Sequence, residues 1–323
     1  MAINRRLLPA GDGCGAAKGQ RTQDIARILL TLLAVFAISS QVVRAEEQES
    51  IAKLEAAAAR GDATAEFELG RAYDIGKEVP TDSKRAFEYY RRAAEHGNAK
   101  AQNNLAALYA TGTDAVPKDE KEARKWLRKA AEQGPALAQA NLGAMLLREN
   151  DKEGLTWLEK AAAQGLVSAQ VRLGEIYYNG DAGVPKDYVK AFDWLRKAAD
   201  QGNAWAQNMV GVMFQNGQGG PKDLNQAVFW FSKAAEQGDA KAQSNLGQML
   251  CAGNGVQRDV VEGYKWLLLA REQHEITAEK FLGGALGDDG FENALSPAER
   301  AAAEKLAEEY KQRHNLSVIA AEP

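Results

Sequence analysis

The 323-residue sequence has few of the residues that most often carry chemistry. It contains three histidines, two cysteines and eight prolines, and only 7% of its residues are aromatic. The histidines, His96, His274 and His314, have no cysteine, carboxylate pair or regularly spaced partner in the sequence. No phosphate-binding loop, nucleophile elbow or zinc-spaced motif is present either. We therefore expect no catalytic centre, no metal site and no cofactor, and an enzyme is the disfavoured alternative.

Long hydrophobic runs are also missing, except near the N-terminus. Residues 1–27 carry five basic residues against two acidic ones, and Ile28–Val43 carries no charge. A basic segment followed by a short apolar stretch and a small residue is typical of a secretory signal peptide, so we predict a signal over residues 1–45 that is cleaved after Ala45. A retained anchor is the alternative, but the strongly apolar part, Ile28–Ile38, is shorter than the roughly 20 residues of a membrane-spanning helix.

The rest of the chain has no excess of basic residues. Without residues 1–45, it would hold 34 basic and 42 acidic residues, a net charge of −8 compared with −4 for the whole chain. An acidic chain without a basic stripe argues against nucleic-acid binding. Cys251 would be the one cysteine left, so no disulfide within the mature chain is expected. These features predict a periplasmic or secreted protein that meets the membrane only transiently, through its signal segment.

The sequence does contain an internal repeat. The motif A-x-A-Q, or a close variant, occurs six times at spacings of 31 to 37 residues, and a seventh, degenerate copy follows. The fourth residues of the seven copies are Glu66, Gln102, Gln139, Gln170, Gln207, Gln243 and Glu279.

Each unit is predicted to form two helices. In the first helix a small residue, usually glycine, lies four residues after the fourth motif residue, although glycine costs a helix about 1 kcal/mol relative to alanine. We interpret it as a point of close helix–helix approach. The connector ends in an aspartate that is expected to cap the second helix, and a metal role for these aspartates is the alternative. The aspartates are Asp82, Asp119, Asp187, Asp223 and Asp259.

The second helix carries a large aromatic residue at one fixed position. These residues are Tyr89, Trp126, Trp157, Trp194, Trp230 and Trp266. One aromatic residue per repeat at one helical position predicts a core column rather than a stacking surface for a ligand. Glycines that suit a left-handed helix end close the second helices, and His274 takes their place in the sixth unit. The closing glycines are Gly97, Gly134, Gly165, Gly202 and Gly238.

Both ends of the array are predicted to be capped. Residues 46–62 are predicted to form a lone second helix before the first repeat, and residues 275–323 a degenerate half-repeat with a closing helix. Ser296 and Glu299 make a capping box at the start of the closing helix, with Pro297 at its first helical position. A polar closing helix is expected because an open solenoid end exposes core.

The unit A-x-A-Q-x-x-L-G-x-x-Y, a Gly-rich turn, an aspartate and A-x-x-W-x-x-K-A-A-x-x-G closely resembles the Sel1-like repeat, a relative of the tetratricopeptide repeat. The resemblance covers about residues 63–274 in six copies, although the turn of the third copy, Arg148–Asp151, lacks the Gly-rich stretch. It implies an all-α fold, an α/α superhelical solenoid that acts as a scaffold or adaptor by binding proteins. Exported bacterial members look like regulators of envelope signalling, surface polysaccharide or host interaction, and a eukaryotic luminal setting is the alternative.

In tetratricopeptide-like arrays the first helices line the concave face, which implies that their free positions are the second, fifth, ninth and twelfth. Trp205 is the one tryptophan outside the core column, and we place it beside Tyr178 of the preceding unit. We therefore predict a peptide- or protein-binding patch there, with packing of Trp205 against the neighbouring repeat as the alternative. The patch consists of Trp205, Asn208, Tyr178, Glu175, Val212 and Gln215. Asn104, Asn141 and Asn245 share one repeat position and are predicted to be structural hydrogen-bonding residues.

Two functions remain open at this point. The leading prediction is an exported, non-enzymatic interaction scaffold or regulator of envelope processes that binds a protein or peptide partner on the concave face. The alternative is a protein associated with the cell wall or with surface polysaccharide. The low aromatic content disfavours that alternative, because most of the aromatic residues are assigned to core columns.

Overall fold

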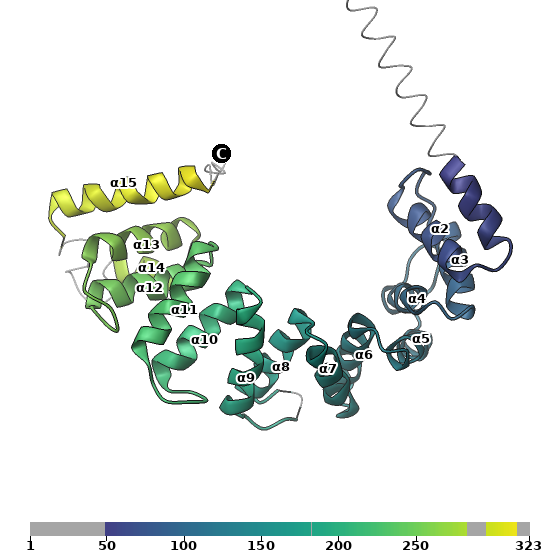
Figure 1. Cartoon of the computed structure of the whole chain (residues 1–323), viewed down its shortest axis with the longest axis horizontal. Helices are drawn as coiled ribbons and strands as arrows, with labels where there is room; N and C mark the ends of the chain where they lie inside the picture. Colours follow the sequence, from purple (N-terminus) through teal and green to yellow (C-terminus); the bar gives the residue numbers. More distant parts are fainter. Residues whose placement is uncertain (1–48, 182, 283–294, 315–323) are drawn as a thin grey trace, which may run out of the picture. The chain divides into compact units, whose positions relative to one another are not determined.

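The structure is a computed structural model that describes residues 49–181, 183–282 and 295–314. Within these ranges the ordered elements are helices, together with one isolated bridge between Thr113 and Val116. A helix over residues 49–58 precedes the labelled helices. These are α2 (Ala63–Ile75), α3 (Ser83–Glu95), α4 (Ala99–Thr111), α5 (Glu120–Glu132), α6 (Ala136–Arg148), α7 (Glu153–Ala163), α8 (Val167–Asn179), α9 (Tyr188–Asp200), α10 (Ala204–Asn216), α11 (Leu224–Glu236), α12 (Ala240–Ala252), α13 (Val260–Glu272), α14 (Ile276–Leu282) and α15 (Pro297–Arg313). The predicted all-α fold is confirmed (Figure 1). The predicted signal segment, residues 1–45, lies outside the described residues.

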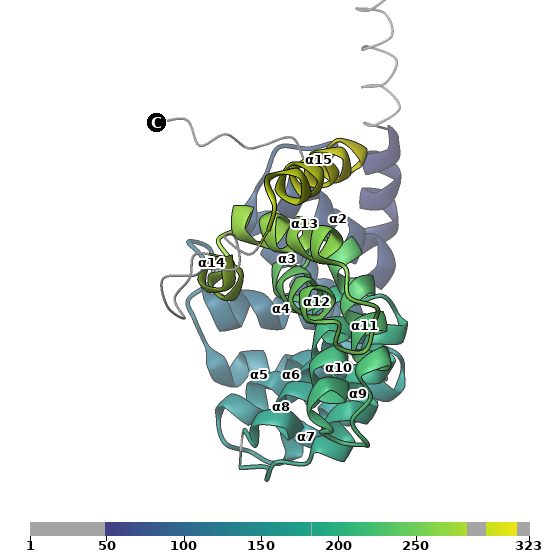
Figure 2. The same ribbon diagram turned by 90° about the vertical axis from the view of Figure 1, so that its left-hand side faces the viewer.

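The chain divides into two compact units, Met1–Trp126 and Leu127–Pro323, with the boundary inside α5. In the first unit, α3 packs against α2 of its own repeat and against α4 of the next. The second unit continues the same pattern from α6 to α13, so that each second helix contacts the first helices before and after it. Within each unit, Figures 1 and 2 show the hairpins following one another in sequence order. This stacking of helical hairpins is the predicted α/α solenoid.

The connectors place an aspartate at the start of the second helices, as predicted. In all five cases the aspartate Oδ1 accepts backbone N–H groups of the first helical turn at 2.9 to 3.1 Å. The third unit has a shorter turn, and a different aspartate accepts from the first backbone N–H group of its second helix. Asn150 takes the left-handed conformation that glycine supplies elsewhere, with a φ of 61°, and Asp151 accepts from the backbone N–H of Glu153 at 2.9 Å.

The glycine inside the first helix is a point of close approach, as predicted. A Cβ atom at Gly70, Gly174 or Gly211 would lie 2.5 to 2.7 Å from the side chain of Tyr90, Leu195 or Phe231. At Gly143 and Gly247 the nearest atom is instead a backbone oxygen of the second helix, at 2.7 Å in both cases. A side chain at this position would therefore push the two helices of a repeat apart.

The aromatic column lies at the edge of the core rather than wholly within it, which corrects the prediction. Trp126, Trp157, Trp230 and Trp266 are buried, but Tyr89 and Trp194 are only half-buried. Lysine ammonium groups lie over several of the rings; Lys197, for example, is 4.0 Å from the centre of Trp194. The deepest position is the next residue along, which in repeats one and three to six packs on the first helix of the same repeat. Its occupants are Tyr90, Leu127, Leu158, Leu195, Phe231 and Leu267, each at most 6% exposed.

The fourth motif residue links consecutive repeats. In five repeats it is a buried glutamine whose Nε2 donates to the carbonyl oxygen of an alanine eight residues earlier, in the preceding second helix, at 3.0 to 3.3 Å. In repeats three to six its Oε1 also accepts from a glutamine at the end of the repeat's own second helix. These side chains therefore join three helices through two hydrogen bonds, because a buried amide must find both a donor and an acceptor.

The ends of the array are covered in the way the sequence predicts. Helix 49–58 contributes Ile51 and Ala58 to a core cluster with α2. At the other end, Ser296 and Glu299 form the predicted capping box of α15, which packs against α13 (Figure 2). Tyr310 of α15 donates its hydroxyl to the carbonyl oxygen of Glu236 at 3.0 Å.

Candidate protein-binding face

The predicted binding patch falls on the first helices of the second unit, chiefly α8 and α10. Trp205, Val212, Glu175, Tyr178 and Gln215 are half-buried there. Asn208 is only 3% exposed, and its Oδ1 accepts a hydrogen bond from Asn245 of α12 at 3.0 Å. Asn208 is therefore a structural residue that a partner cannot reach in this arrangement. Asn245 has the structural role that its repeat position predicts.

The structure does not bring Tyr178 and Trp205 together. The Tyr178 hydroxyl donates to Oε1 of Gln218 at 3.2 Å, and its ring meets Tyr188 edge-on with the centres 5.3 Å apart. Gln218 follows the C-terminal end of α10, whereas Trp205 lies in its first turn. Since a helix rises 1.5 Å per residue, these two ends are roughly 15 Å or more apart. Tyr178 therefore lies beside the connectors between the helices of a repeat and does not form a patch with Trp205.

The exposed face of the first helices is rotated from the predicted one. In the last two repeats, several fifth and twelfth positions turn toward the next repeat or into the core, as Asn208, Ser244 and Cys251 show with exposures of 1 to 4%. Burial also raises the pKa of the Cys251 thiol to about 12. The second, sixth, ninth and thirteenth positions are the more accessible ones. They share one side of the helix, since residues three, four and seven apart lie on the same face.

On α10 this accessible face is apolar. Trp205, Met209 and Val212 follow one another at helical spacing, and all three are half-buried and pack against core clusters from outside. Met209 was missed in the sequence because its position was assigned to structural asparagines. The i, i+4, i+7 spacing of the three residues is the signal that could have identified it. Trp205 thus packs against a core cluster that includes residues of neighbouring repeats, and it keeps part of its surface accessible.

The helices on either side of α10 present polar residues at the same positions. On α8, Arg172 and Glu175 form an ion pair at 3.2 Å, which neutralises both charges locally. On α12 the corresponding residues are Lys241, Asn245 and Gln248. Helix α10 itself contains no charged residue. The face therefore consists of an apolar centre with a polar rim, which is the composition of a protein-binding hot spot.

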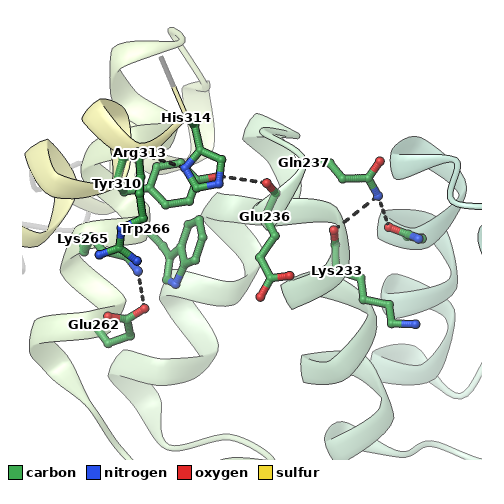
Figure 3. A pocket seen from close by; sticks show the side chains of 10 residues that line it. Lys233, Glu236, Gln237, Glu262, Lys265, Trp266, Tyr310, Arg313 and His314 are labelled. Atoms are coloured by element: carbon green, nitrogen blue, oxygen red, sulfur yellow. Dashed lines mark hydrogen bonds and ion pairs between the residues drawn. The ribbon is translucent and has the colours of Figure 1, made fainter. Parts of the chain in front are cut away.

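A pocket lies near the C-terminal end of the array. It has a volume of about 710 Å³ and is lined by residues of α10, α11, α13 and α15, and the sequence did not predict it (Figure 3). Its groups largely satisfy one another: Lys265 bonds to Glu262 and lies 4.0 Å over the ring of Trp266. His314 stacks on Tyr310, with the ring centres 4.1 Å apart. These contacts explain how α15 is held and leave no obvious set of groups aimed at a ligand.

Titratable residues are dispersed along the described helices. In residues 49–181, 183–282 and 295–314, no three His, Cys, Asp or Glu side chains gather in a way that could hold a metal ion. His96 bonds to Glu66 at 2.6 Å, and His274 occupies the left-handed position of the missing glycine with a φ of 58°. None of the helices in these ranges is long and apolar enough to cross a membrane.

Comparison with known proteins identifies the repeat. A model of the Sel1 repeat matches six consecutive segments: residues 63–98, 99–135, 136–166, 167–203, 206–239 and 240–274. The chain belongs to the Sel1 repeat family. Sel1 repeats generally mediate protein–protein interactions, and proteins of the family are typically non-catalytic. No curated protein matches the chain.

Two solved structures show the same Sel1 architecture. One is a protective antigen present in uropathogenic Escherichia coli strains that displays an SLR fold; it has 33% identity and a TM-score of 0.68. The match covers 81% of this chain but only 57% of the antigen, so the chain spans little more than half of that protein's length. The other is a Sel1 repeat protein from Oxalobacter formigenes, with 31% identity, a TM-score of 0.59 and 84% coverage of both chains. Both support the α/α solenoid.

Proposed function

We propose that this Sel1 repeat protein is an exported, non-enzymatic scaffold or regulator of envelope processes, and that it binds a protein partner on the face formed by its first helices. The observation that carries the proposal is the contrast between the two helix layers of the second unit. Helices α6, α8, α10 and α12 carry only four charged residues, Arg148, Arg172, Glu175 and Lys241, whereas the second helices α7, α9, α11 and α13 carry fourteen. A face with little charge loses little hydration when a partner covers it.

Export is proposed on the N-terminal sequence. The basic segment, the uncharged stretch Ile28–Val43 and the small residue Ala45 have the order of a secretory signal. The likeness to a protein described as a protective antigen agrees with export, since an antigen that protects is accessible to the immune system. Association with the cell wall or with surface polysaccharide is the competing function, and the same experiment separates the two.

The proposal is tested by capture from an envelope extract with the full chain as bait. We expect a protein to be retained by the native chain and lost with Trp205→Ala, because Trp205 supplies the largest accessible apolar group of α10. Leu137→Ala is the matched control, since Leu137 holds the same repeat position on α6 and is 55% exposed. Retention of glycan, or of the same proteins by all three chains, would contradict binding through this face.

A further inference from the structure

The direction of the apolar surface on the first-helix face specifies the shape of the partner. We name the residues Trp205, Met209 and Val212 the α10 stripe. Their spacing of four and three residues places them in a row along the helix axis, about 10 Å long at 1.5 Å per residue. All three lie on one helix of the second unit and are half-buried.

Across the helices, from α8 through α10 to α12, the apolar surface is interrupted by polar residues. At the repeat position of Trp205, α8 has Ser168 and α12 has Lys241. At the position of Met209, the neighbours are Arg172 and Asn245, and at the position of Val212 they are Glu175 and Gln248. An extended segment that crossed the helices would therefore meet one apolar position followed by a polar one. A segment aligned with α10 would keep apolar contact along the whole stripe.

We propose that the α10 stripe is the docking site for an amphipathic helix of a partner protein, which lies along α10 with its apolar face inward. A helix offers apolar residues at i, i+3 or i+4, and i+7, which is the spacing of the stripe itself. The occupant carries little charge on that face, because α10 has no charged residue to pair with it. Its flanks are polar and meet the Arg172–Glu175 pair on one side and Lys241 on the other. Met209 adjusts to the facing side chains because its side chain is long and unbranched.

This proposal rests on the proposed function and adds the conformation and polarity of the partner segment. The probe is a displayed library of random 18-residue segments selected for binding to the full chain. We expect the selected segments to carry apolar residues at helical spacing, to gain helix on binding by circular dichroism, and to lose at least tenfold in affinity against Trp205→Ala and Met209→Glu. Leu137→Glu, which places a charge at the Trp205 position of α6, is expected to change the affinity less than twofold.

Thermal unfolding of each variant distinguishes a loss of binding from a loss of folding. If Met209→Glu does not fold, the test of the α10 stripe uses Trp205→Ala alone. Selected segments with alternating apolar residues or internal proline would overturn the helical partner. Segments that bind the native chain and both α10 variants equally would overturn the docking site while leaving an interaction scaffold in place. Failure to select any segment that distinguishes the native chain from Trp205→Ala would also reject the stripe.

Discussion

Glu66 shows how a single residue changes the link between repeats. The other five repeats have a glutamine here, which donates to one carbonyl group and accepts from a second amide in four of them. Glu66 is fully buried and has no hydrogen to donate. Arg92 forms an ion pair with Glu66 at 2.8 Å and donates a hydrogen bond to the carbonyl oxygen of Ala58 at 2.8 Å, while His96 stands where the later repeats have glutamine. The first repeat thus replaces an amide bridge with a charged one.

We predict that Glu66→Ala lowers the free energy of unfolding of the first unit by about 2 kcal/mol. The substitution leaves two basic groups facing a buried space, although the guanidinium of Arg92 is partly exposed and regains some hydration. Denaturant titration followed by circular dichroism measures the change. The double variant Glu66→Gln with His96→Gln rebuilds the amide pair of the later repeats and is expected to stay within about 1 kcal/mol of the native chain. Equal losses for the single and double variants would show that the charges themselves are required.

At the scale of the element, the close packing of α6 and α7 depends on two facing glycines. A Cβ on Gly143 would lie 2.7 Å from the carbonyl oxygen of Gly154, and a Cβ on Gly154 would lie 2.5 Å from that of Gly143. Backbone meets backbone here, so no side chain can turn aside to make room. In α10, by contrast, a Cβ on Gly211 meets the ring of Phe231 at 2.7 Å.

We therefore predict that Gly143→Ala destabilises the second unit by about 2 kcal/mol, because strain of about 3 kcal/mol exceeds the roughly 1 kcal/mol gained in helix propensity. Gly211→Ala is expected to cost less, since an aromatic side chain moves more easily than a helix backbone. Thermal unfolding of the two variants compares them directly. Ala106 is the internal reference for both variants, because it holds the same repeat position in α4 and already carries a Cβ in the native chain. A stabilising effect of Gly143→Ala would mean that propensity outweighs the contact.

At the scale of the whole molecule, the proposed export would determine the compartment in which the proposed binding face meets a partner. We predict that the protein is recovered from the periplasm or the medium and that N-terminal sequencing of this material begins at Glu46, because the apolar stretch ends just before Ala45. An Ala45→Leu variant is expected to accumulate uncleaved, since a large residue blocks the cleavage position. Recovery of the whole chain in the membrane fraction would instead support a retained anchor.

The sequence by itself determined the repeat, the two-helix unit, the capping aspartates and the role of the helical glycines. Each of these depends on neighbours within one repeat, so its physical cause recurs every 31 to 37 residues and is visible without the fold. The closing helix α15 was predictable for the same reason, because Ser296, Pro297 and Glu299 form a local cap. In the structure, the buried residues Leu268 and Leu269 stand where other second helices have Arg, Lys, Glu or Ser.

Only the tertiary structure decided which side of the first helices is accessible. Burial of Asn208 depends on the helix of the next repeat, and the hydrogen bond from Tyr178 reaches a connector 40 residues away. The rotation between stacked hairpins sets both contacts, and no pattern within one repeat encodes that rotation. The patch predicted from repeat positions therefore kept Trp205 and Val212, left out Met209 and included residues that face a neighbouring helix. Local spacing specifies the helices, whereas the packing of one repeat on the next decides which of their side chains a partner can touch.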